Sequence, residues 1–392
     1  METSAPSSNI PNEIIRIILL QLPVKSIIRF QCACKQWRSI IQDSDFKLSY
    51  GGQGRLIILT HESERGDSQN SRKLAVRSTT RHDDLRLERQ ESPLGEAAAY
   101  PLIPGSDQYR VTALCCCNGF VLLAAGERDI LLWNPLTKCS TKVLESPGPM
   151  GLKSLGALAG LCYDSRTRDY KVVLLLLCDS MRMHDFDDQY VISASLTHKK
   201  WRSVRFPYFF GSTRGSVGFR NTFHWWVSDI TDIDWYDLPR AHMNRILYFD
   251  PVHDEFRILP TPLEQRENNS IIGLGVIDGC LSMACIPHHN EEEINTMQVL
   301  IMKEYGIEES WMTVFSIQMP TYRSLDLTLF YFQTNNTKQV IFTRKGSDRC
   351  HVYVYDRKKD ELKEVLMDLL KQNSWGYFTS MFFDVENFNC LA

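Results

Sequence analysis

The sequence has no apolar run of the roughly twenty residues that a membrane-spanning helix requires. Its longest candidate, Val172–Cys178, has only the length of a strand. The first basic residue is Arg16, and the apolar stretch around it is also interrupted by Gln21, so we expect no secretory signal. The formal net charge is only −3, which favours neither nucleic acid nor a membrane surface as a partner.

Sequence signatures of catalysis and metal binding are missing as well. There is no phosphate-binding Walker loop, no dinucleotide-binding glycine pattern after a strand and no Gly-x-Ser-x-Gly elbow. His288–His289 and Glu291–Glu293 predict a solvated loop, because adjacent side chains without a fixed helical spacing do not converge on one ion. The acidic stretch His184–Asp188 lacks the glycine and the closing glutamate of a calcium loop. We therefore expect a non-catalytic protein with no metal and no cofactor.

The 12 cysteines follow no regular spacing. A long chain without a cysteine framework is typical of reduced proteins of the cytoplasm or nucleus, and we expect that location here. Cys115–Cys117 are consecutive in an apolar strand-like run, so neighbouring thiols should point to opposite faces of a sheet. Cys280 and Cys285 lie in an apolar strand pair and are expected to be buried structural thiols.

The residue pattern divides the chain into regions of different predicted structure. Residues 1–9 are rich in serine and proline and predict a disordered tail. Residues 10–50 predict a helical module, in which Pro11 and Pro23 each stand where a helix can begin. The helices are expected over 11–21, 24–31 and 33–42. From residue 55 onward, short runs of apolar, β-branched and aromatic residues alternate with turns, which is typical of a β domain.

The β region contains a repeat. Each repeat consists of an apolar strand, a polar turn and a second strand, and the turns recur at spacings of 62, 54, 55 and 51 residues. The matching turn positions are Asn134, Leu196, Asp250, Tyr305 and Asp356. A period near fifty in a chain of strands predicts kelch-like propeller blades of four strands each, stacked around a ring so that both faces are buried.

The two ends of the β region supply one more blade. Strand-like segments remain outside the five repeats, at 55–60, 73–78 and 375–385. A blade shared between both ends would close the ring. Residues 61–96 are rich in charge of both signs and predict a solvated, mobile insertion around one short strand. The predicted fold is mainly β, with a small N-terminal three-helix module followed by a β-propeller-like domain, residues 55–392, of about six blades. A seven-bladed or incomplete ring is the alternative.

The first predicted helix is apolar on nearly every face. Such a helix must be enclosed, and a segment of about forty residues is too small to bury all of it. Residues 10–41 carry a local charge of +4 in a chain that is acidic overall. The charged residues are Arg16, Lys25, Arg29, Lys35 and Arg38, with Glu13 as the acid. We expect the helices to bind an acidic partner, unless they are simply a cap packed on the β domain.

The segment Ile10–Ile41 resembles the F-box motif of plant F-box proteins. It contains Ile10-Pro11, Leu22-Pro23, Val24, Lys25, Ser26, Arg29-Phe30, Cys34-Lys35 and Trp37 in the order of that motif. It departs mildly at Ile10, where leucine is usual, and at Ala33, where valine is usual. The resemblance implies binding to a Skp-type adaptor and, through it, to a cullin. The residues that it places in contact with the adaptor are Ile10, Pro11, Ile14, Ile17, Ile18, Leu22, Pro23, Val24, Ile27 and Ile28.

The rest of the chain resembles the F-box-associated domain, a kelch-like domain common in plants. The segments that carry this resemblance are Cys117–Phe120, Trp133–Thr137, Tyr163–Val173, Lys303–Gly306 and Ser310–Trp311. It implies a propeller that binds a target protein. Large aromatic residues in turn-rich segments are candidates for that contact, namely Tyr208, Phe209, Phe210, Trp235 and Tyr236. The alternative is that these side chains form a small core under their own loops.

The two resemblances together imply a substrate-recognition subunit of a Skp–cullin–F-box ubiquitin ligase, with a target that the sequence does not identify. Two other functions stay open at this point. One is an F-box scaffold that acts without a cullin. The other is a propeller enzyme whose active-site residues are dispersed along the sequence and converge only in the fold.

Overall fold

A computed structural model gives the arrangement of the chain. It describes residues 10–22, 24–43, 46, 54–63, 71–79, 87–90, 100–101, 111–126, 128–135, 139–148, 158–177, 189–207, 213–228, 244–262, 269–287, 296–318, 330–334, 339–345, 350–365 and 377–385. No helix among these residues is long and apolar enough to cross a membrane.

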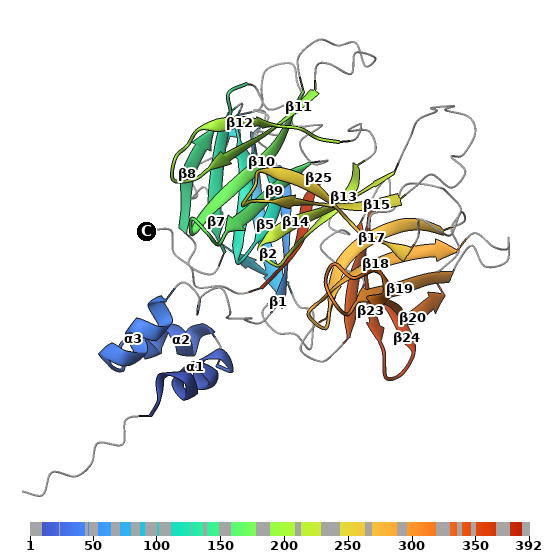
Figure 1. The fold of residues 1–392 in the computed structure, drawn as a ribbon, viewed down its shortest axis with the longest axis horizontal. Helices are drawn as coiled ribbons and strands as arrows, with labels where there is room; N and C mark the ends of the chain where they lie inside the picture. Colours follow the sequence, from blue (N-terminus) through green and yellow to red (C-terminus); the bar gives the residue numbers. More distant parts are fainter. Residues whose placement is uncertain are drawn as a thin grey trace, which may run out of the picture.

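Three short helices form the N-terminal module (Figure 1). They are α1 (Asn12–Leu20), α2 (Val24–Phe30) and α3 (Lys35–Gln42). The carbonyl of Pro11 accepts from the backbone amides of Ile14 and Ile15, both at 3.1 Å, so α1 begins directly after this proline. Helix α3 begins two residues later than predicted, because Cys34 is extended and its Sγ accepts from the amide of Trp37 at 3.4 Å. The predicted helices are otherwise confirmed to within a residue at each end.

The module has a core of its own. It contains the buried side chains Ile15, Leu19, Ile27, Ile41 and Phe46. Phe30 and Trp37 pack beside them edge to face, with ring centroids 5.0 Å apart. One apolar stripe of α1 therefore faces the core of the module, while its second apolar stripe faces away from that core.

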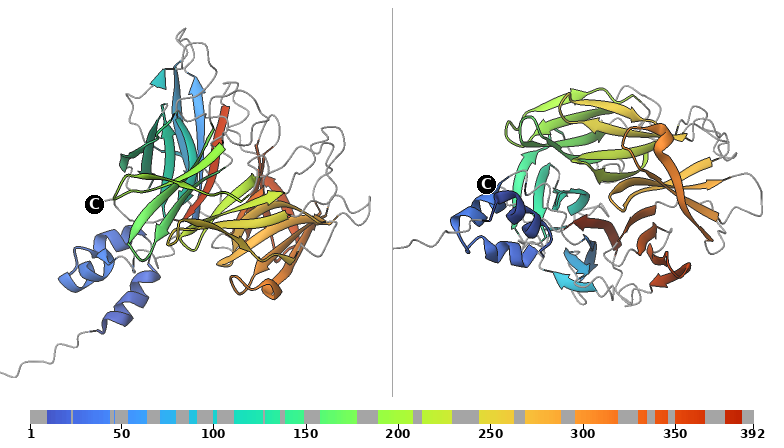
Figure 2. Two further views of the ribbon diagram at one scale, coloured as in Figure 1. Left: turned by 45° about the horizontal axis from the view of Figure 1, so that its top comes forward. Right: turned by 60° about the horizontal axis from the view of Figure 1, so that its bottom comes forward.

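In the remaining chain, the described strands form six four-stranded antiparallel units, which we number as blades around the ring (Figure 2). Blade 2 consists of β5 (Val111–Cys117), β6 (Phe120–Ala125), β7 (Asp129–Asn134) and β8 (Cys139–Glu145). Blade 3 consists of β9 (Ala159–Asp164), β10 (Asp169–Leu177), β11 (Gln189–Ser195) and β12 (Trp201–Val204). Blade 4 consists of β13 (Thr213–Phe219), β14 (Thr222–Ser228), β15 (Asn244–Asp250) and β16 (Glu255–Leu259).

Blades 5 and 6 follow the same plan. Blade 5 consists of β17 (Asn269–Ile277), β18 (Cys280–Pro287), β19 (Thr296–Met302) and β20 (Trp311–Gln318), with a short 3-10 helix, Glu308–Ser310, before β20. Blade 6 consists of β21 (Phe330–Thr334), β22 (Val340–Lys345), β23 (Cys350–Asp356) and β24 (Glu361–Val365). Strands β17 and β21 pair in parallel, which joins these two blades into one sheet. The sequence repeat gave no sign of this pairing, because it is made between repeats.

The closing blade, blade 1, is built from both ends of the β region, as the sequence predicted. Its strands are β25 (Tyr377–Val385), β1 (Gly54–Ser63), β2 (Ser71–Thr79) and β3 (Leu87–Gln90), and β4 (Tyr100–Pro101) pairs beside β2. Strand β25 pairs with β1 from Gly54 opposite Val385 onward. The expected insertion at 61–96 is corrected by this sheet, since two strands and the end of a third lie there instead of one short strand. Polar residues alternate along these strands, and for this reason the sequence predicted a loop.

Tryptophans fasten neighbouring blades together. Trp201 and Trp311 each begin the fourth strand of a blade and donate from Nε1 to a backbone carbonyl at, or directly after, the end of the fourth strand of the blade before. The acceptors are Glu145, at 2.7 Å, and Pro260, at 3.0 Å. Trp225 is fully buried in the same interior. Trp311 is also buried, and Trp201 packs partly buried against the hydrophobic core.

Gly160 allows blades 3 and 4 to approach each other. A Cβ at this position would lie 2.9 Å from Cζ2 of Trp225 and 3.0 Å from Cβ of Phe223. We expect Gly160→Ala to lower the free energy of unfolding by about 1–3 kcal/mol, because the buried indole has no room to move. Chemical denaturation of the full chain measures this. Gly148→Ala is the control, since nothing lies within 4 Å of its Cβ position; equal losses in both variants would contradict the close-packing argument.

Candidate functional site

Helix α1 exposes a row of isoleucines. Ile10, Ile14, Ile17 and Ile18 are 49%, 47%, 57% and 42% exposed, respectively. Their spacing of three and four residues places them along one side of the helix. Ile28 of α2 adds a fifth exposed side chain, at 43%. Isolated exposed isoleucines are ordinary. Five of them within nineteen residues form an apolar face whose exposure to water is unfavourable.

The opposite side of α1 explains why this face stays outside. Ile15 and Leu19, four residues apart, are 1% and 0% exposed and fill the module's core. Two apolar stripes therefore run along one short helix, and three helices can enclose only one of them. The second stripe therefore remains at the surface of the module.

The structure corrects one predicted adaptor contact, Ile27, and does not describe the side chains of two others. Ile27 is 0% exposed and packs in the module's core, so it supports the face from beneath instead of forming it. Leu22 is half-buried beside that core, and Pro11 is exposed. Pro23 and the side chain of Val24 lie outside the described residues.

Two side-chain hydrogen bonds hold the N-terminal end of α1 in place. The Gln36 side-chain amide donates to Asn12 Oδ1 at 2.8 Å and to the carbonyl of Ile10 at 3.3 Å. These bonds hold Ile10 in line with the exposed face. Sequence reasoning did not single out Gln36, because its partners lie more than twenty residues away and give no local signal.

Cationic side chains surround the module. Arg16 lies 3.6 Å from the carboxylate of Asp43, and its guanidinium lies over the ring of Phe46 at 5.5 Å. Arg29, Lys35 and Arg38 are exposed. A positive surround beside an apolar face suits an acidic partner and increases the association rate more than the affinity.

The aromatic residues predicted to contact a target, Tyr208–Phe210 with Trp235 and Tyr236, lie outside the described residues. The strands that flank them are described. Thr213 pairs with Val227, and Ser228 pairs with Asn244, so both segments are anchored at neighbouring strand ends of blade 4.

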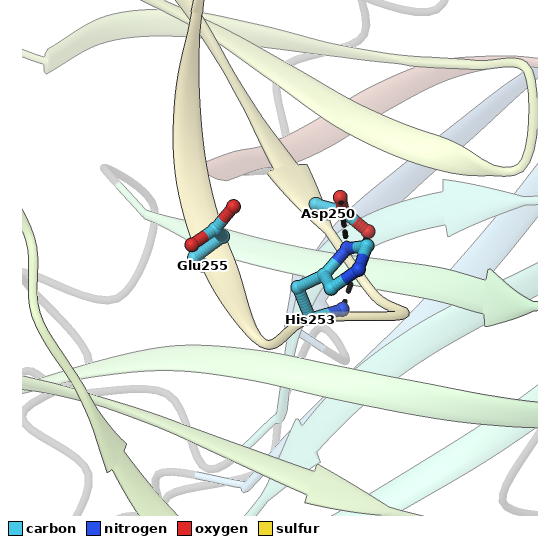
Figure 3. Close-up of side chains that lie close together, drawn as sticks. All are labelled: Asp250, His253 and Glu255. Carbon is cyan, nitrogen blue, oxygen red and sulfur yellow. Dashed lines mark hydrogen bonds and ion pairs between the residues drawn. The ribbon is translucent and has the colours of Figure 1, made fainter.

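One group of possible metal ligands occurs among the described residues, at the β15–β16 turn (Figure 3). Asp250 Oδ2 lies 2.8 Å from Nδ1 of His253 and 3.0 Å from the guanidinium of Arg257. Arg257 also donates from Nε to Glu255 at 2.7 Å. The arginine already balances both carboxylates, so this group is an ion-pair network that stabilises the turn.

His224 is the histidine most sheltered from water among the described residues, with 0% exposure. Its Nε2 lies 2.8 Å from the hydroxyl of Tyr305, and its ring stacks on Tyr248 at 5.8 Å. Burial lowers the pKa of His224 to about 3, and a backbone contact with Val217 opposes this only weakly. The imidazole is therefore neutral at physiological pH and joins blades 4 and 5 as a packing group.

The shifted His224 pKa predicts a pH effect on stability. The unfolded chain binds a proton here below the ordinary value of 6.5, but the folded chain does not until about pH 3. Stability is therefore lost as the pH falls through this window, by about 2 kcal/mol at pH 5 relative to pH 7. Urea unfolding at both values should show a smaller pH difference for His224→Gln than for the wild type. An identical difference in the two proteins would show that the buried histidine is protonated when folded.

The described residues define a small three-helix module with an exposed apolar face, joined to a β-propeller. Comparison with known families agrees: residues 75–384 match the F-box associated beta propeller domain, and residues 7–49 match the F-box domain. The chain belongs to the F-box associated beta propeller family and is a plant F-box protein.

Relatives in Arabidopsis thaliana have the same combination. An F-box/kelch-repeat protein is 28% identical, over 79% of this chain and 79% of its own length. The F-box protein CPR1 is 27% identical, over 93% of this chain and 89% of its own length. Among solved structures, an oligogalacturonate lyase in complex with manganese aligns over 79% of this chain and 85% of its own, with 11% identity and a TM-score of 0.41. So loose a likeness carries no argument about chemistry. The two matched domains support a substrate-adaptor role in a Skp–cullin–F-box complex, and F-box proteins are generally non-catalytic.

Proposed function

We propose that this chain is the substrate-recognition subunit of a Skp–cullin–F-box ubiquitin ligase in the cytoplasm or nucleus. The F-box binds a Skp-type adaptor, which connects it to a cullin, and the propeller binds a target protein. The observation that carries this proposal is the exposed isoleucine face of α1 and α2 beside a fully formed core. Burying the exposed half of such a side chain stabilises a complex by about 1 kcal/mol.

The proposed role requires no bond chemistry from this chain. The propeller holds a target close to a ubiquitin-charged enzyme that the cullin carries, so a lysine of the target is present at high effective concentration. The aromatic segments Tyr208–Phe210 and Trp235–Tyr236 are the proposed contact with the target. The described strand ends that flank them, at Thr213, Ser228 and Asn244, lie side by side in blade 4 and support this proposal.

Purified full-length protein tests the proposal directly. It should co-elute from size exclusion with a plant Skp-type adaptor and, when the adaptor is present, with a cullin. Retention of the adaptor without the cullin would instead support a scaffold that acts alone. Affinity capture after proteasome inhibition, followed by mass spectrometry, then identifies the target as a protein that accumulates with the bait.

A further inference from the structure

In each blade, one turn connects the first strand to the second, and another connects the third strand to the fourth. These turns can be compared from blade to blade. Strands alternate in direction, so all these turns lie at one end of the ring. The chain enters β1 at that same end, since Gly54 pairs with the last residue of the inner strand β25. Among the described turns at this end, non-glycine residues with left-handed backbone occur in blades 2 to 6, with φ between 50° and 65°. The cations among them are Arg168 and Lys199 of blade 3 and Arg220 of blade 4.

Among the described blades, blade 3 alone has a left-handed cation in both of these turns, since blade 4 has Arg220 in the first but Asp254 in the second. Blades 4 and 6 have aspartate between the third and fourth strands, a residue that adopts left-handed backbone more readily than most. Blade 3 instead has Arg168 in one turn and Lys199 in the other, with φ of 56° and 54°. Long cationic side chains gain nothing from this conformation. Their presence at both turns of one blade therefore points to a use for the charge.

These two turns form one surface, which we call the basic edge. Its members are Arg166, Arg168, His198, Lys199, Lys200 and Arg202, all exposed. Asp169 ties the turns together, because its carboxylate accepts from the hydroxyl of Ser195 and from the amide of Thr197. The edge is therefore a fixed arrangement of cations on adjoining turns.

The acids near the basic edge are already engaged. Asp164 is buried, and Asp169 faces Ser195. Arg202 lies 3.7 Å from Asp254. Among the described residues, no ion pair involves the four cations Arg166, Arg168, Lys199 and Lys200. Their charge is consequently available to a partner.

The β23–β24 turn provides a contrast within the same ring. It also carries cations, Arg357, Lys358 and Lys359, but Asp356, Asp360 and Glu361 stand on either side of them. Arg357 pairs with Asp278 at 2.7 Å. Cations alone are therefore common at this end of the propeller. Blade 3 differs because its flanking acids, Asp164 and Asp169, are engaged by Lys171 and Ser195, whereas the carboxylate of Asp356 is influenced by the charge of Lys359.

We propose that the basic edge of blade 3 docks an Asp/Glu-rich segment of a partner protein. The cations are spread over two turns and do not converge on one point, which matches a row of carboxylates better than a single phosphate group. An acidic chain with a net charge of −3 is poorly suited to nucleic acid. The inference goes beyond adaptor docking by the F-box and stands independently of it.

Fluorescence anisotropy with a labelled poly-glutamate peptide and full-length protein tests this. The wild type should bind at low salt and weaken as salt is added. Arg168→Asn/Lys199→Asn should bind about tenfold more weakly. Its melting temperature should be unchanged or higher, because asparagine adopts left-handed backbone more easily. Lys358→Asn/Lys359→Asn removes equal charge at the balanced turn and should bind within about twofold of the wild type.

Three outcomes would overturn the proposal. The first is no peptide binding by the wild type at low salt. The second is an equal loss in both double variants, which would mean that only total charge matters. The third is tighter binding of single-stranded RNA, or of a peptide whose only charge is one phosphoserine, than of poly-glutamate. Each outcome is separate from adaptor binding, which the same samples report by co-elution.

Discussion

Ile14→Asp/Ile17→Asp is expected to weaken binding of a Skp-type adaptor roughly a thousandfold. Both side chains are about half exposed in the free chain and belong to the row that we propose the adaptor covers. Each replacement removes an apolar contact and places a charge where the interface excludes water, at a cost of about 2 kcal/mol apiece. Biolayer interferometry with the purified adaptor measures the change.

The fold should survive this double substitution, because neither isoleucine lies in the core. Far-ultraviolet circular dichroism and the melting temperature should therefore match those of the wild type. Ile258→Asp is the matched control: it is 45% exposed, but on β16 of the propeller, and should leave adaptor affinity unchanged. Binding of the double variant within a few-fold of the wild type would remove the isoleucine face from the interface.

Lys171→Met is expected to lower the free energy of unfolding by about 3–5 kcal/mol. The ammonium group joins blades 3 and 4: it donates to Asp254 Oδ1 at 2.9 Å and to the carbonyl of Pro251, and lies 3.6 Å from Asp164 Oδ2. The Asp164 side chain is 0% exposed, and Lys171 only 12%. Methionine fills the space but leaves a buried carboxylate without its cation. Urea unfolding of the full chain gives the value.

An exposed lysine in the neighbouring blade provides the control. Lys142 pairs with Asp129 at 2.8 Å, but both side chains are about half exposed. Lys142→Met should therefore cost under about 1 kcal/mol. The triple variant Lys171→Met/Asp164→Asn/Asp254→Asn should recover part of the loss, since no buried charge is then left unpaired; Arg202, the former partner of Asp254, is exposed to water. Equal effects of the two single lysine substitutions would show that burial of the network does not matter.

The Lys171 effect should also depend on pH. Burial would raise the pKa of Asp164, but hydrogen bonds from Thr167 and from the Arg166 amide, together with the Lys171 ammonium, hold it below the ordinary 3.8. The stability that the ionised carboxylate contributes is present above that value and lost as the pH falls toward the lowered pKa. The gap in unfolding free energy between wild type and Lys171→Met should accordingly narrow as the pH falls toward the lowered pKa of Asp164, because the carboxylate that Lys171 stabilises is then protonated in both proteins.

Local pattern in the sequence was enough for the main features of the architecture. The order of residues around Leu22-Pro23 and Trp37 identifies the F-box, and the recurrence of turns near every fifty residues predicts the blades. Both signals depend on neighbours in the chain, because helix and strand periodicity and turn chemistry act over a few residues. The closing blade was also predictable, since only one place remained for the leftover strands.

The three-dimensional packing decided which of these residues do what. Ile15 and Ile27 are as apolar as Ile14 and Ile28, and only the meeting of α1, α2 and α3 buries the first pair and exposes the second. The ion network of Lys171 and the pairing of β17 with β21 join residues tens of positions apart. The sequence by itself determined that this is an F-box protein with a propeller. The tertiary structure decided which apolar and charged side chains remain for partners, because burial depends on contacts between distant segments that no local pattern encodes.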